Sequence, residues 1–76
     1  MPHLAPVKRT LFEKYLRSKG CTYKRTSGDH LIYSRNNLNR PIVFPADREV
    51  PIMVIRTNLK TLSESIERFF EDLKKL

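Results

Sequence analysis

A single histidine stands among cations at the start of an apolar run, and it is the residue of this chain best suited to proton transfer. The segment Gly28-Asp29-His30 precedes the run 31–35 and follows the basic stretch 23–26, Tyr-Lys-Arg-Thr. Histidine is the side chain that most readily takes and gives a proton near neutral pH, and lysine and arginine attract the phosphates of a nucleic acid. The combination predicts contact with RNA, or chemistry on it.

The side chains that RNA cleavage requires are few. RNA carries its own nucleophile, the 2′-hydroxyl beside the scissile phosphate, so a base, an acid and cations for the developing charge suffice. His30 is the candidate acid or base. Exposed aromatic rings commonly hold single-stranded RNA by stacking on its bases. The candidates for contact with RNA are therefore Lys24, Arg25 and Arg35 for phosphates and Tyr33 for a base.

Two of these assignments have structural alternatives. Tyr33 shares its side of the expected strand with Leu31, so a place in the core fits it as well as stacking does. Lys24 and Arg25 are neighbours on one strand, and strict alternation places them on opposite faces.

No cofactor or metal is predicted, because His3 and His30 are far apart in the sequence and lack matched Cys or carboxylate spacing.

The positive charge of the chain is unevenly distributed. The net charge is +7, and residues 1–40 carry nine Lys and Arg residues against two acids, whereas residues 41–76 carry six of each. The half that contains His30 therefore holds all of the excess, which favours a polyanion as partner.

The 76 residues are enough for one small domain. Residues 1–6 contain two prolines and are expected to form a flexible tail, with a single domain over 7–76. Cys21 is the only cysteine, so an internal disulfide is ruled out. No apolar run approaches the ~20 residues that cross a bilayer, so we expect no membrane contact and a cytoplasmic protein.

Helical signals mark the two ends of the domain. Thr10-x-x-Glu13 fits a capping box, apolar residues follow at helical spacing, and Gly20 suits a C-terminal stop, which predicts a helix over 10–19. Residues 50–55 fit either a buried strand or a helix. The spacing of apolar residues from 52 to 62, with Pro51 at the first helical position, favours a helix over 51–61. Ser63 is the expected N-cap of a last helix.

Three short strands are expected between the helices, over 21–26, 30–35 and 41–44, with turns at 27–29 and 36–39. Connections this short predict an antiparallel meander. The order α-β-β-β-α, with an additional C-terminal helix, predicts a small α+β domain of two layers, in which helices cover one face of a three-stranded sheet.

The pattern resembles the HicA family of toxins over about residues 7–73. It consists of a helix, Gly20, the run Tyr23-Lys24-Arg25-x-x-Gly28-Asp29-His30-x-x-Tyr33-x-Arg35 and an apolar strand that ends at Pro45. The resemblance implies a fold related to double-stranded-RNA-binding domains, ribosome-independent cleavage of mRNA, and neutralisation by a HicB antitoxin. It also implies that His30 is the functional histidine. The family most often has serine where this chain has Asp29, and it often has a second histidine where this chain reads Pro45-Ala46-Asp47.

Three function classes follow. The first is the toxin of a type II toxin–antitoxin pair, a metal-independent endoribonuclease that uses His30. The second is a non-catalytic RNA-binding module of the same fold, which the basic first half and the missing second histidine favour. The third is a protein-interaction domain, which the apolar run 52–55 favours. The oligomeric state is open, a homodimer included.

Overall fold

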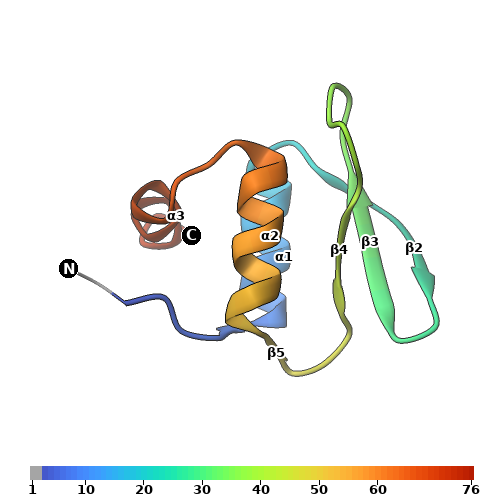
Figure 1. Ribbon diagram of the computed structural model, residues 1–76, viewed down its shortest axis with the longest axis horizontal. Helices are drawn as coiled ribbons and strands as arrows, with labels where there is room; N and C mark the ends of the chain where they lie inside the picture. The colour runs from blue at the N-terminus through green and yellow to red at the C-terminus, as the bar shows by residue number, and fades with distance from the viewer. Residues whose placement is uncertain (1–2) are drawn as a thin grey trace.

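The computed structural model describes residues 3–76 and has the expected α+β architecture (Figure 1). Three helices lie to one side of an antiparallel sheet with strand order β2-β3-β4, and a second, two-stranded pairing joins β1 to β5. The elements in chain order are β1 (Val7–Lys8), α1 (Arg9–Ser18), β2 (Thr22–Ser27), β3 (His30–Ser34), β4 (Ile42–Pro45), β5 (Glu49–Val50), α2 (Ile52–Leu62) and α3 (Ile66–Leu73).

Helix α1 begins differently from the prediction and ends as predicted. The capping box of Thr10 and Glu13 is wrong: the N-cap position is Lys8, and no side chain of the described residues caps the helix. Strand β1 leads directly into the helix, and the Arg9 N–H donates to the Arg48 carbonyl (2.9 Å), so a backbone oxygen takes the place of a capping side chain. At the other end Gly20 has φ +84°, and the Cys21 N–H donates to the Leu16 carbonyl in the last turn, which is a Schellman motif.

The register of the meander assigns each strand residue to a face. Tyr33 lies opposite Tyr23 on β2 and Ile42 on β4, and this set turns toward the helices. His30 pairs with Ser27 on one side and with Pro45 on the other. These residues turn away from the helices. The face that they occupy, which we call the open face, consists of Thr22, Arg25, Ser27, His30, Ile32, Ser34, Val43 and Pro45.

A bulge in β2 overturns the simple alternation expected there. Tyr23 pairs with Tyr33, but the next pair joins Arg25 to Ile32, so Lys24 is an extra residue. Arg25 therefore lies on the face opposite to Tyr23 rather than on the same one. The predicted opposition of Lys24 and Arg25, which assumed an unbroken period of two, fails for the same reason.

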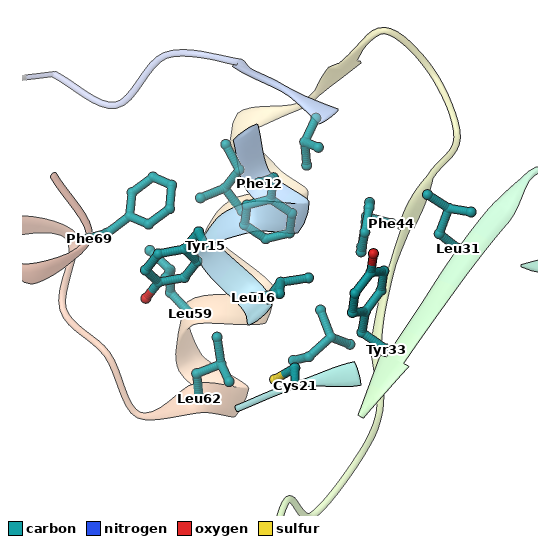
Figure 2. Packing of buried hydrophobic residues seen from close by; sticks show 13 residues of the cluster. Phe12, Tyr15, Leu16, Cys21, Leu31, Tyr33, Phe44, Leu59, Leu62 and Phe69 are labelled. Carbon is teal, nitrogen blue, oxygen red and sulfur yellow. The ribbon is translucent and has the colours of Figure 1, made fainter. Parts of the chain in front are cut away.

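The core forms where α1 is held between α3 and the sheet (Figure 2). The Phe12 ring meets Phe44 of β4 edge to face at 5.1 Å between centroids, and Tyr15 meets Phe69 of α3 at 4.7 Å. All four rings are fully buried. Aromatic pairs of this kind add roughly 0.5–1.5 kcal/mol each beyond the area they bury. They fix the sheet and α3 on opposite sides of α1.

The ambiguous segment before α2 contains both a strand and a helix. Glu49 and Val50 pair with β1, and the helix starts at Ile52 with Pro51 as its N-cap rather than its first helical residue. The predicted N-cap of the last helix is also wrong. Ser63 ends α2 in the left-handed region (φ +58°), and it is Ser65 whose side chain accepts from the Arg68 N–H at 3.1 Å.

The N-terminal segment has no regular structure over residues 3–6, but Leu4 packs against the core. Residues 1–2 of the predicted tail lie outside the described residues.

Candidate nucleic-acid interface

His30 begins β3 directly after a two-residue turn. Ser27 and His30 face each other across the hairpin, which leaves Gly28 and Asp29 as the turn. Gly28 has φ +58° and Asp29 is not in the positive region, which fits the hairpin turns that take glycine first. The Asp29 carbonyl accepts a hydrogen bond from the Ala46 N–H at 2.6 Å. The end of β4 thus anchors the turn, and the backbone of His30 is held between two strands.

The His30 imidazole lies on the open face and is exposed to solvent. Ser27, on one neighbouring strand, and Pro45, on the other, are its direct cross-strand neighbours, and Arg25 lies two residues from Ser27 on the same face. No side chain of residues 3–76 forms a hydrogen bond with the imidazole. The ring is therefore free to meet a ligand that approaches the sheet from outside.

The two cations of β2, the strand paired with β3, are exposed. Every residue of β2 is exposed, Lys24 and Arg25 included, because β2 is the edge strand that lies farthest from the helices (Figure 1). Neither cation has a carboxylate within 4 Å among the described residues. Arg25 shares the open face with His30, and both cations keep their full positive charge available to a phosphate.

Tyr33 does not belong to this surface, so its predicted stacking role is wrong. The side chain is 1% exposed, and its ring packs beside Phe44 at 5.7 Å. The hydroxyl donates to Glu13 Oε1 at 2.5 Å and accepts from Arg17 Nη1 at 3.2 Å. Burial, and then the bond to Glu13, raise the pKa of Tyr33 to about 12. A buried ring cannot stack on a base, and here it joins β3 to α1.

Arg35 makes a contact within the protein that the sequence did not predict. Its Nη1 donates to the Lys19 carbonyl at 2.6 Å, and its side chain passes 4.0 Å from the position of a Cβ at Gly20. The guanidinium thus holds the C-terminal end of α1 against the end of β3. It is half-buried there, and its charge lies beside the partly negative C-terminal end of the helix, which it stabilises.

Sequence reasoning missed three exposed side chains. Tyr23, the aromatic residue of β2, is 53% exposed, but its pairing places it on the face opposite to His30. Arg40, in the loop before β4, and Lys60, on α2, line one hollow. Arg40 and Lys60 are far apart in the sequence, so no local pattern predicts that they lie close together. The exposure of Tyr23 follows from the edge position of β2, which periodicity does not reveal.

Other cations are engaged in ion pairs away from the open face. Arg9 pairs with Glu13 at 2.9 Å, and Lys19 pairs with Asp72 at 2.6 Å and with Glu64 at 3.6 Å. The bond from Lys19 lowers the pKa of the Asp72 carboxyl. The Arg9 pair lies within α1, whereas the Lys19 pairs join the C-terminal end of α1 to α3 and to the segment between α2 and α3. These pairs account for part of the positive charge without any partner.

The described residues contain neither a group of His, Cys, Asp and Glu side chains that could hold a metal ion nor a helix able to cross a membrane. Cys21 is buried, and this burial raises the pKa of its thiol.

Comparison of the chain with protein-family models, with curated proteins and with solved structures gives no match. The class of molecule is accordingly defined by its own fold and site. It is a small α+β domain with one open sheet face on which a histidine and an arginine without an ion-pair partner among residues 3–76 stand together.

Proposed function

We propose that this protein is an endoribonuclease of the HicA type, which cleaves mRNA with His30 as general acid or base. The observation that carries the proposal is the place of His30: it is exposed at the start of β3, on the face that no helix covers, together with Arg25. A single-stranded RNA laid across this face meets a proton-transfer group and a cation on neighbouring strands of the sheet.

The chemistry needs little else from the protein. Removal of the proton of the 2′-hydroxyl lets that oxygen attack the adjacent phosphorus. Protonation of the 5′-oxygen lets its bond to phosphorus break, so that the downstream RNA fragment leaves. His30 serves one of these proton transfers. Arg25 and Lys24 supply the positive charge that offsets the extra negative charge on the phosphate oxygens in the transition state.

The resemblance to the HicA family extends the proposal to partners and location. A toxin of this kind acts on mRNA in the cytoplasm and is held inactive by a HicB-like antitoxin. The open face is the surface that such an antitoxin has to cover to stop cleavage.

A matched pair of histidine variants tests the proposal. His30→Ala should abolish RNA cleavage in vitro and growth arrest on expression, whereas His3→Ala should retain both, because His3 lies in the segment before β1. Cleavage that persists in His30→Ala would show that another group transfers the proton. Circular dichroism of both variants checks that the fold is unchanged.

A non-catalytic RNA-binding module is the second candidate, and one observation favours it. The His30 imidazole has no hydrogen-bonding side chain to orient it or share its proton among residues 3–76. Wild-type protein that binds RNA with strong salt dependence and leaves it intact would establish this module instead. Protein that neither binds nor cleaves RNA would favour a domain that docks another protein.

A further inference from the structure

A hollow lined by two cations lies at the end of the molecule opposite the Gly28–Asp29 turn. It is formed between the loop that joins β3 to β4 and the outer side of α2, and it measures about 410 Å³. In Figure 1 this loop and the C-terminal end of α2 are both at the top, whereas the β2–β3 turn is at the bottom. The lining residues are Asn39, Arg40, Thr57, Lys60, Thr61 and Ser63.

The hydrogen-bonding groups of the hollow suit an anion. No carboxylate lines it, and neither Arg40 nor Lys60 has a carboxylate within 4 Å among residues 3–76. The Thr57 and Thr61 hydroxyls donate to backbone carbonyls of α2. Within residues 3–76 the remaining donors form no hydrogen bond or ion pair, and they are the guanidinium of Arg40, the ammonium of Lys60, the amide of Asn39 and the hydroxyl of Ser63.

The end of α2 does not oppose an anion as strongly as a bare helix end would. Carbonyls at a helix C-terminus are partly negative. Here the Lys60 carbonyl accepts from the Ser63 N–H at 3.1 Å, and the Leu59 carbonyl accepts from the Glu64 N–H at 2.9 Å. Two of the carbonyls nearest the hollow are thus already bonded, and the two cations dominate its charge.

We propose that this hollow binds a phosphate of the same RNA strand whose scissile phosphate lies at His30, an inference that rests on the proposed function. The path between the two sites follows the open face along β3, past Ile32 and Val43. The four steps from His30 to Ser34 span ~14 Å at about 3.4 Å per residue. The hollow lies beyond that, so an RNA must be several nucleotides long to occupy both sites.

The test compares two doubly neutralised variants on RNA that cannot be cut. Arg40→Gln/Lys60→Gln removes the two cations of the hollow, and Lys74→Gln/Lys75→Gln removes the same charge at the exposed C-terminal end of the chain. The ligands are a 2′-O-methylated octanucleotide and the corresponding dinucleotide, which lack the attacking hydroxyl. Affinity is measured over a series of salt concentrations, and inorganic phosphate and the octanucleotide are each titrated against ¹⁵N-labelled wild-type protein.

For the octanucleotide we expect the hollow variant to lose about tenfold in affinity, because charge-assisted hydrogen bonds contribute this order of free energy. Its log–log salt slope should fall by about 0.7, the value for one single-stranded phosphate contact. The dinucleotide should bind both variants equally, and inorganic phosphate should shift the amide signals of Lys60 and Thr61.

The remaining outcomes overturn the inference in distinguishable ways. If the hollow variant matches the C-terminal control on the octanucleotide, the hollow does not bind RNA, while cleavage by wild type and its loss in His30→Ala still support the proposed function. If inorganic phosphate shifts the amide signals of Lys60 and Thr61 but the octanucleotide does not, the occupant of the hollow is a free anion. If wild type binds no RNA at all, both the inference and the proposed function fail.

Discussion

Replacement of Tyr33 by phenylalanine separates a structural role from a role in RNA binding. The variant Tyr33→Phe would keep the ring that packs beside Phe44 but would lose the bond to Glu13 Oε1 (2.5 Å) and the bond from Arg17 (3.2 Å). A hydrogen bond to a charged group contributes about 1.5–3 kcal/mol. Because the Glu13 side chain is 16% exposed, water partly replaces the lost donor, and we expect a loss of ~2 kcal/mol. For a domain of this size that lowers Tm by roughly 8–16 °C.

Tyr23→Phe is the matched control, because among residues 3–76 the Tyr23 hydroxyl bonds only to the exposed Thr26 Oγ1 at 2.7 Å. It should change stability by no more than about 0.5 kcal/mol. Urea unfolding followed by circular dichroism measures both variants, and RNA affinity is measured on the folded proteins. Tyr33→Phe should bind RNA as tightly as wild type. Wild-type stability together with weakened RNA binding would refute the reasoning, because it would mean that the hydroxyl meets RNA rather than Glu13.

Three further variants test other parts of the fold. Gly28→Ala should cost about 1–2 kcal/mol, because a side chain at φ +58° is strained; a thermal unfolding midpoint equal to that of wild type would contradict this. Asn58→Ala should cost about 1–3 kcal/mol in urea unfolding, because the Val43 carbonyl loses its 3.1 Å donor, and an unchanged midpoint would argue against that bond. Lys19 lowers the folded pKa of Asp72 below 3.8, so this pair stabilises the protein above that pH and the contribution disappears on acidification. Lys19→Met should therefore reduce the loss in free energy of unfolding between neutral and acidic pH, and a loss as steep as in wild type would exclude the pair as its cause.

Much of the fold follows from local signals that act over a few residues. The stop at Gly20, the turn at Gly28, the alternation of Leu31 and Tyr33 with His30 and Ile32, and the apolar spacing of α2 all appear as expected. Each depends on backbone conformation or on the period of one element, which a short stretch of sequence determines.

The errors at the helix starts have two physical causes. At α1 a backbone carbonyl takes the place of the predicted side-chain cap, and at α3 a different serine occupies the N-cap position. The Arg48 carbonyl meets the Arg9 N–H across β1 and β5, and the left-handed Ser63 ends α2 before Ser65 starts α3. Neither event is visible from residues adjacent in sequence.

In the candidate site, too, some properties follow from adjacent residues and others only from packing. Adjacent residues alone are enough to establish that His30 follows a glycine turn, opens a strand and stands in the cationic half of the chain. Which neighbours are available to a ligand depended instead on packing, which buried Tyr33 against Glu13, engaged Arg35 with the end of α1, and moved Arg25 onto the face of His30 through a bulge. Exposure and hydrogen bonding are set by the elements that pack together, and those contacts join residues far apart in the chain.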